Sequence, residues 1–262
     1  MKPIFSDSPN FILAEGKPAA GAFDRQVLVS GFDQERYSGS TLLFIGAGGL
    51  TSAIAPAATR KGIGTEKFLD PDRVEPSNLS RQFFTASDIG QYKPVALVRN
   101  LEAVCTAQTR LYGYAISFQQ ALAEGLNLSC DVALCCVDNN PSRNAVSPYF
   151  RARGIPVVFV AVSSDSDHGY VFIQDRQGPC IGCLFPDMAT DQRHPCPDTP
   201  AISDILQAVG ALAIYAIDTL LMGRRRDWNY RTIFLRSGQF DGASTIGQRR
   251  GCPLCAHNDA GY

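Results

Sequence analysis

The stretch that decides the fold is STLLFIGAGGLT, residues 40–51. A short apolar run enters a glycine-rich turn, and residues 50–61 then have a helical pattern in spite of Pro56. A second apolar run, residues 66–69, ends at Asp70. In dinucleotide-type βαβ units the first turn receives phosphate at a helix N-terminus, and a carboxylate ends the second strand. The spacing from the first glycine to Asp70 is that of such a unit.

Further apolar and helical segments alternate beyond this unit. We expect a helix over residues 93–104 and strands over residues 132–137 and 156–162. Alternation of this kind predicts an α/β fold with a Rossmann-like, mostly parallel sheet and flanking helices. Residues 1–22 show no clear periodicity, so an irregular N-terminal arm is expected there.

The rest of the chain, residues 23–262, is expected to form a single domain. Its nucleotide-binding half would take in residues 40–165, and residues 166–262 would form the second half. At 262 residues the chain has ample length for a large core. This organisation places the glycine turn near the start of the domain.

The composition excludes several classes of protein. Hydrophobic residues make up 45% and charged residues 19%, with a formal net charge of −1. This balance argues against a disordered chain and gives no field for binding nucleic acid or an anionic membrane. The N-terminus does not join a basic start to a long apolar run, so no secretory signal is expected. A cytoplasmic protein is predicted.

Residues 202–222 form the most apolar stretch, about long enough to cross a bilayer. The stretch carries Asp204 and Asp218, and an arginine triplet follows it. We therefore predict a buried helix with Ser203 as its N-cap and Gly223 as its C-terminal breaker. The arginines would lie at the negative end of the helix dipole.

Two tight cysteine pairs indicate a structural zinc site. They are Cys180 with Cys183 and Cys252 with Cys255. Tetrahedral zinc is bound by four thiolates that two such turns present. The long gap between the pairs means that the metal would clip the C-terminal part back onto the domain, unless the spacing of the four thiols is accidental. The other cysteines expected in the core are Cys105, Cys130, Cys135 and Cys136.

A polar string from Asp70 to Gln82, DPDRVEPSNLSRQ, follows the second strand of the unit. Lys93 and Asp138 lie at corresponding edges of the predicted sheet, where open α/β sheets bind ligands. Together these residues offer a ribose acceptor, cations for phosphates and a carboxylate for Mg²⁺. Hydride transfer needs none of the extra cations, whereas ATP chemistry does.

These motifs resemble the ubiquitin-activating superfamily, in the compact prokaryotic form typified by the ThiF, MoeB and HesA proteins. The resemblance covers residues 23–255, nearly the whole chain. It is carried by the opening FDRQVL, the glycine turn GAGGL, the string DPDRVEPSNLSRQ, IGQYK, CVDN, PCIGCLFP and the closing CPLC. The long polar string together with the paired cysteine turns is highly specific.

The resemblance implies ATP-dependent adenylation of the C-terminal glycine carboxylate of a small β-grasp protein, either a ubiquitin-like modifier or a sulfur carrier. Asp70 would hold the ribose, and Asp138 would hold Mg²⁺. Attack on the α-phosphate builds negative charge, so cations and a metal are required around the phosphorus. The full nucleotide-binding set that the resemblance implies is Gly46, Gly48, Gly49, Asp70, Asp72, Asn78, Arg81, Lys93 and Asp138.

The resemblance also implies partners. Arg25 would reach the active site of the other subunit in a homodimer. Cys196, between His194 and Asp198 on a polar loop, would take the modifier as a thioester and pass it to a conjugating enzyme. The catalytic set is therefore expected to be Arg25, Arg81, Lys93, Asp138 and Cys196.

Several alternatives stay open. Thr51 stands where the family has its third glycine, which would crowd the turn or alter helix packing. The protein could adenylate a sulfur carrier without forming a thioester, or serve a stand-alone ubiquitin-like conjugation system of the bacterial type, which the divergence favours. The function of a nicotinamide-dependent oxidoreductase would leave Arg81 and the two cysteine pairs without a role. A catalytically silent scaffold would not need Arg81, Lys93 and Asp138 together.

Overall fold

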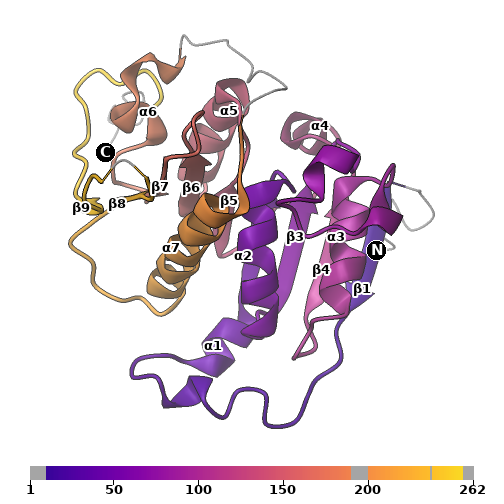
Figure 1. Cartoon of the computed structure of the whole chain (residues 1–262). Helices are drawn as coiled ribbons and strands as arrows, with labels where there is room; N and C mark the ends of the chain where they lie inside the picture. Colours follow the sequence, from indigo (N-terminus) through magenta and orange to yellow (C-terminus); the bar gives the residue numbers. More distant parts are fainter. Residues whose placement is uncertain (1–9, 190–199, 237, 256–262) are drawn as a thin grey trace.

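The computed structural model describes residues 10–189, 200–236 and 238–255 (Figure 1). Within them the strands are β1 (Phe11–Glu15), β2 (Thr41–Ile45), β3 (Thr65–Leu69), β4 (Arg110–Tyr114), β5 (Val132–Cys135), β6 (Val157–Val162), β7 (His168–Gln174), β8 (Tyr230–Phe234) and β9 (Gly242–Ser244). They form one sheet in the order β1-β4-β3-β2-β5-β6-β7-β8-β9. The pairs from β4 to β6 are parallel, and the outer pairs are antiparallel. The predicted α/β, mostly parallel sheet is confirmed.

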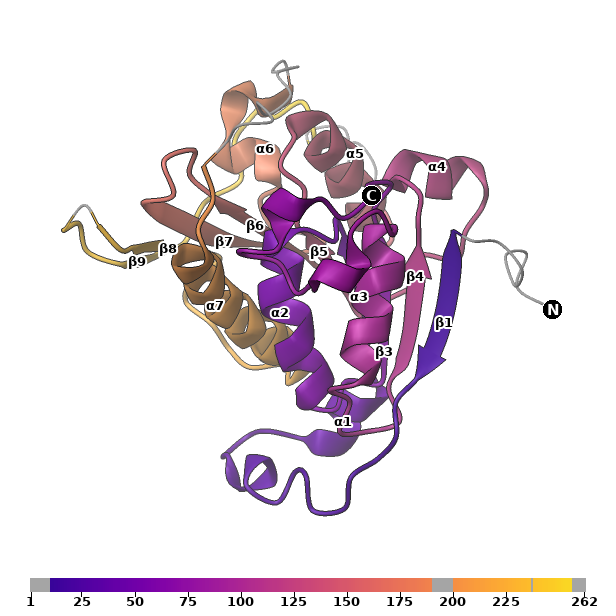
Figure 2. The ribbon, with the colours of Figure 1, turned by 45° about the vertical axis from the view of Figure 1, so that its right-hand side comes forward.

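The helices cover both faces of this sheet (Figures 1 and 2). The α-helices of the described residues are α1 (Gln34–Gly39), α2 (Gly49–Arg60), α3 (Lys93–Glu102), α4 (Phe118–Ala123), α5 (Asn140–Arg151), α6 (Ile181–Leu184) and α7 (Ser203–Leu221). Leu42 and Phe44 of β2 belong to the core beneath α2, α3 and α7. Leu43 and Ile45 belong to the core beneath α4 and α5. Alternate side chains of one buried strand thus supply two cores, as expected of a strand covered on both faces.

The order of the strands places a crevice at one edge of the sheet. After β2 the chain adds β3 and β4 on one side, and it then returns to add β5 and β6 on the other. The carboxyl ends of β2 and β5, which pair in parallel, therefore lie at the point where the winding reverses. Open α/β sheets bind ligands at such a point.

The prediction of an irregular arm over residues 1–22 was wrong at residues 11–15, which form β1. This strand pairs antiparallel with β4, with Leu13 opposite Tyr112. Ile12 and Ala14 pack against the core, so the strand is stabilised by burial of one face. A five-residue strand at the edge of a sheet gives too short a pattern to stand out in the sequence.

Helix α7 lies beside α2 (Figure 1). The approach is close, because a Cβ on Gly210 would lie 2.8 Å from that of Ala53. Ile202, not Ser203, is the N-cap residue, so that prediction was wrong, whereas Gly223 ends the helix at a φ of 63° as expected. By length and composition alone α7 could cross a membrane, but half of its apolar window is buried in the fold.

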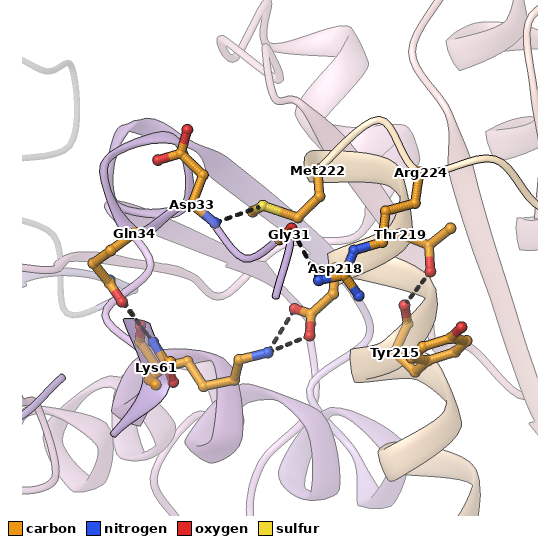
Figure 3. A network of polar contacts seen from close by, with 10 residues as sticks. Gly31, Asp33, Gln34, Lys61, Tyr215, Asp218, Thr219, Met222 and Arg224 are labelled. Carbon is orange, nitrogen blue, oxygen red and sulfur yellow. Dashed lines mark hydrogen bonds and ion pairs between the residues drawn. The ribbon is translucent and has the colours of Figure 1, made fainter. Parts of the chain in front are cut away.

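A polar network fixes the C-terminal end of α7 to the start of the domain (Figure 3). Lys61 Nζ, beyond the end of α2, lies 2.5 Å from Asp218 Oδ2 on α7. Arg224 Nη2 donates to the carbonyl of Gly31 at 3.0 Å. The arginine that follows α7 is therefore used to close this edge of the fold, as well as lying at the negative end of the helix dipole.

A buried carboxyl group on β3 predicts how stability depends on pH. Glu66 is 0% exposed, and its Oε2 accepts a 2.5 Å hydrogen bond from Thr59. Burial raises the pKa of Glu66 to about 8, although the bond from Thr59 works against this. The folded protein thus holds a proton that the unfolded chain releases near pH 4.5. The contribution of Glu66 to stability is therefore lost as the pH rises from 4.5 through about 8.

We expect Glu66→Gln to remove this dependence, because the amide carries no titrating proton. Its stability relative to the wild type should rise by about 1.4 kcal/mol per pH unit within that range. Urea unfolding at pH 5, 6.5 and 8 measures the difference, with the exposed Glu124→Gln as control. Parallel stabilities of the wild type and Glu66→Gln at the three pH values would contradict the assignment.

Candidate active site

A cavity of about 1070 Å³ opens at the carboxyl edge of the sheet, around the ends of β2, β3 and β5. Every residue of the predicted nucleotide-binding set lines it, namely Gly46, Gly48, Gly49, Asp70, Asp72, Asn78, Arg81, Lys93 and Asp138. These residues come from separate strand ends and loops, which the parallel topology brings to one edge. A cavity of this size is in the range of sites for small molecules and cofactors.

The three glycines of the turn differ in what a side chain would meet at each position. Gly46 has a φ of +96°, and a Cβ there would lie 2.9 Å from the carbonyl oxygen of Cys136. A Cβ on Gly49 would lie 2.8 Å from Leu206, but a Cβ on Gly48 would meet nothing within 4 Å. Gly48 is also the N-cap of α2, so the first amides of this helix meet the open space of the cavity. Such a helix start binds phosphate.

Asp70, the carboxylate that follows β3, is held in one orientation. Its Oδ2 accepts a 2.7 Å hydrogen bond from the amide of Ala47, and its Oδ1 accepts one of 2.8 Å from the amide of Asp72. Burial raises its pKa, although the charge of Lys93 and these two bonds oppose the shift. The fixed carboxylate keeps spare acceptor capacity for a hydroxyl group of a ligand.

Lys93 lies among carboxylates from several strand ends. Its Nζ is 2.8 Å from Asp72 Oδ2. Burial works against its charge, but the negative charges of Asp70, Asp72 and Asp138 outweigh burial, so the pKa of Lys93 is raised. A lysine that stays charged inside a cavity is suited to bind a phosphate group.

Asp138 follows β5 and faces the same cavity. It is exposed, and its Oδ1 accepts a hydrogen bond of 3.5 Å from Asn139. The negative charge of Asp138 acts on Lys93, which shows that the ends of β3 and β5 share one electrostatic site. An accessible carboxylate beside phosphate-binding cations is a fitting ligand for Mg²⁺.

The polar string supplies a second cation. Arg81 Nη1 donates to the carbonyl of Ser77 at 2.5 Å, and Arg81 lines the cavity. Asn78 Oδ1 accepts from the amide of Glu75 at 3.1 Å and closes a capping box. The amide oxygen of Asn78 is thereby committed to the local turn, and its Nδ2 donates to Ser77 Oγ at 3.4 Å, which leaves a second N–H of Nδ2 for a ligand.

Arg143 is a cavity residue to which sequence reasoning gave no role. It lies in the first turns of α5, donates from Nη2 to the carbonyl of Val137 at 2.9 Å, and has a buried Nε without a hydrogen-bond partner. The signal was the run Asn139-Asn-Pro-Ser, since Asn139 caps α5 with Pro141 in its first turn. A helix that starts at this strand end places Arg143 beside Val137.

The predicted metal site forms apart from the cavity. The thiols of Cys180, Cys183, Cys252 and Cys255 are buried and lie within 4.8 Å of one another. Sγ separations of 3.5 and 3.8 Å fit tetrahedral zinc, whose bonds of about 2.3 Å place sulfurs about 3.8 Å apart. Cys180 is the N-cap of α6 and Cys183 lies within this helix, whereas Cys252 and Cys255 belong to the C-terminal segment, so a zinc ion would join the two parts as predicted.

The other cysteines are not all core residues. Cys135 is buried, whereas Cys105, Cys130 and Cys136 are partly exposed. Cys136 lines the cavity, because it follows the last residue of β5. Cys136 also packs against the core beneath α2, α3 and α7, so the predicted core position is confirmed in part, and its place at the end of β5 brings it to the ligand edge as well.

Arg25, a predicted catalytic residue, is not among the residues that line this cavity. It is exposed and precedes Gln26, whose side-chain Nε2 donates to the carbonyl of Lys61 at 2.9 Å. Lys61 follows the C-terminus of α2, about 18 Å along the helix from the glycine turn. Arg25 therefore lies far from the site of its own chain. Cys196 lies outside the described residues.

Comparisons with known proteins agree with this geometry. Residues 23–253 match the model of the ThiF family. The chain is 29% identical over 195 residues to the sulfur carrier protein adenylyltransferase of Thermus thermophilus, covering 72% of each protein. It is 27% identical to the sulfur carrier protein ThiS adenylyltransferase of Escherichia coli K12, covering 91% of this chain and 96% of that one. The crystal structure of Escherichia coli MccB with ATP has the same fold, with a TM-score of 0.68 at 16% identity over 85% of this chain and 68% of that one.

Proposed function

Because the chain belongs to the ThiF family, we propose that it uses ATP to adenylate the C-terminal carboxylate of a small ubiquitin-like or sulfur-carrier protein. The observation that carries this proposal is the cavity itself, in which Lys93, Arg81 and Asp138 meet the start of α2. Two similar curated proteins are adenylyltransferases of sulfur carriers. Family membership disfavours the nicotinamide-dependent oxidoreductase that the glycine turn alone allowed.

Each residue has a part in this chemistry. Asp70 would accept hydrogen bonds from the ribose, and the amides at the start of α2 would bind phosphate. Lys93 and Arg81 would stabilise the charge that builds on the α-phosphate and on the departing pyrophosphate. A bound Mg²⁺, held by Asp138, would add a further positive charge at the phosphates. The attacking carboxylate is already ionised, so the site needs no general base.

The modifier's C-terminal tail would enter where the cavity extends past β5. This part is lined by Arg143, Tyr170 and Phe185, and it adjoins the segment that precedes α7. The tail would run over the crossover segment 187–199, as the resemblance implies. Binding of an extended tail there would bring its carboxylate to the α-phosphate in the orientation needed for attack.

We also propose that the active form is a homodimer. Arg25 lies at the opposite end of α2 from the cavity of its own chain, so it can serve catalysis only in the site of a second copy. Light scattering at micromolar concentration measures the assembly. A monomer with full adenylation activity would contradict this arrangement.

Thioester transfer is the finer step of the proposal. After adenylation, the thiolate of Cys196 would attack the acyl carbon, form a thioester and release AMP, and a conjugating enzyme would then receive the modifier. We expect Cys196→Ala to retain pyrophosphate exchange but to lose a thiol-labile adduct with the modifier. An adduct that persists in Cys196→Ala would restrict the function to adenylation, as in sulfur-carrier activation.

The function as a whole is tested by pyrophosphate exchange. The purified chain is incubated with ATP, Mg²⁺ and labelled pyrophosphate, with and without small β-grasp proteins encoded near its gene. Label should enter ATP only when a cognate protein with an intact C-terminal glycine is present. The same protein lacking that glycine is the matched control. Exchange that does not depend on the glycine would refute the proposed substrate.

A further inference from the structure

A buried hydrogen bond supports the glycine turn beside the end of β5. Thr51 Oγ1 donates to the carbonyl of Gly46 at 2.6 Å, and Thr51 is 0% exposed. The single hydroxyl proton of Thr51 is thus used for the Gly46 carbonyl.

Thr51 stands where the family has its third glycine, and the sequence left open whether it crowds the turn or alters helix packing. In the structure its side chain is buried and its hydroxyl supports the turn.

The bond from Thr51 lies between two groups that the nucleotide must reach together. The turn is already fixed on one side, where the amide of Gly46 donates to the carbonyl of Leu69 at 2.8 Å. On the other side the Cβ position of Gly46 abuts the carbonyl of Cys136, two residues before Asp138. Thr51 adds the bond that fixes the Gly46 carbonyl, so the peptide units leading to the amides of α2 have one orientation.

We propose that Thr51 is a positioning residue for the nucleotide: its hydroxyl holds the Gly46 carbonyl and so fixes the phosphate-binding turn against the end of β5, close to Asp138. This inference rests on the proposed function, since it assumes that the cavity binds ATP. It assigns a role to the residue that departs from the three-glycine pattern. A glycine at position 51 would leave the turn without this bond. The threonine side chain adds a hydroxyl-to-carbonyl contact that a glycine cannot make.

The test separates the hydroxyl from the shape of the side chain. Thr51→Val keeps the shape but leaves the Gly46 carbonyl unpaired, whereas Thr51→Ser keeps the hydroxyl. Calorimetric titration with Mg²⁺-ATP should show roughly 10-fold weaker binding for Thr51→Val and recovery of most of the affinity in Thr51→Ser. In pyrophosphate exchange the weaker binding by Thr51→Val should appear mainly as a higher KM for ATP.

Thr109→Val is the matched control. Thr109 is also 0% exposed and donates to a carbonyl, that of Ile63, at 2.7 Å, but it does not line the cavity. Both valine variants should lose thermal stability, and only Thr51→Val should lose affinity for ATP. Thr51→Ala also removes the hydroxyl and should weaken ATP binding in the same direction, and it carries the test if Thr51→Val does not fold.

The outcomes separate two failures. ATP binding that is equal in the wild type, Thr51→Val and Thr51→Ala overturns the positioning role and leaves the proposed function intact. An equal loss of affinity in Thr51→Val and Thr109→Val also overturns it, because the effect would then be one of general stability. A wild-type protein that binds no ATP refutes the proposed function, and the role of Thr51 with it.

Discussion

Asp138→Ala is expected to abolish partner-dependent exchange of pyrophosphate into ATP. Asp138 is exposed on the wall of the cavity, and its charge acts on Lys93 from the end of a different strand. Its removal takes away the proposed carboxylate ligand of Mg²⁺ and unbalances the charges around the phosphates. A decrease of at least about 10³-fold is expected, the upper range for loss of one preorganised charged group.

Two further variants make this result specific. Asp138→Asn keeps the shape of the side chain and removes only its charge, so it should be nearly as inactive as the alanine variant. Glu124→Ala, which changes an exposed carboxylate outside the cavity, should keep the wild-type rate. Exchange by Asp138→Ala at the wild-type rate would show that the metal is held elsewhere.

The second large effect is expected at the cysteine cluster. Cys252→Ser should cause loss of zinc and release of the C-terminal segment, because the Sγ of Cys252 lies 3.5 Å from that of Cys180 in a far part of the chain. Structural zinc contributes on the order of 10 kcal/mol to the folding of zinc-finger peptides, and part of that stabilisation would be lost here. Metal analysis should find one zinc ion per wild-type chain, and limited proteolysis should find the C-terminal segment cleaved faster in the variant.

Cys130→Ser serves as the control, since Cys130 is partly exposed and lies outside the cluster. It should retain the zinc ion and the proteolytic pattern of the wild type. A folded wild-type protein that holds no zinc, when purified without chelator, would contradict the metal site. Full zinc content in Cys252→Ser would show that three thiolates are enough.

The parallel half of the fold could be predicted because its signals are local. The run 41–45, the glycine turn and the run 65–69 lie next to one another in the sequence, and each has its own pattern. Both faces of β2 are buried and its residues are nearly all apolar, whereas β3 carries Glu66 and Lys67 and was recognised by its place after the glycine turn. The site followed from the same signals, because the carboxyl ends of parallel strands must meet at one edge.

The outer strands could not be predicted in this way. β1 and β9 are short edge strands, and β8 is only half-buried along its length. Their pairing is decided by contacts with strands far away in the sequence, as between Tyr230 and Phe172. Patterns over three to seven residues carry too little information for this.

Close contacts inside the site were also beyond sequence reasoning. The requirement for glycine at position 46 comes partly from the carbonyl of Cys136, about ninety residues away in the sequence. The bond from Thr51 to Gly46 and the buried Nε of Arg143 likewise depend on how separate strand ends meet. Residue types predicted which chemistry is available, whereas the fold decides which groups touch.

The most direct measurement is the mass of the acyl-adenylate. The chain, Mg²⁺-ATP and a cognate β-grasp protein are mixed with inorganic pyrophosphatase, quenched in acid and examined by intact-protein mass spectrometry. We predict that the small protein gains the mass of one adenylyl group, that removal of its terminal glycine prevents the gain, and that Asp138→Ala does not produce it. A cognate protein whose mass stays unchanged while ATP is hydrolysed to ADP would contradict adenylation as the function.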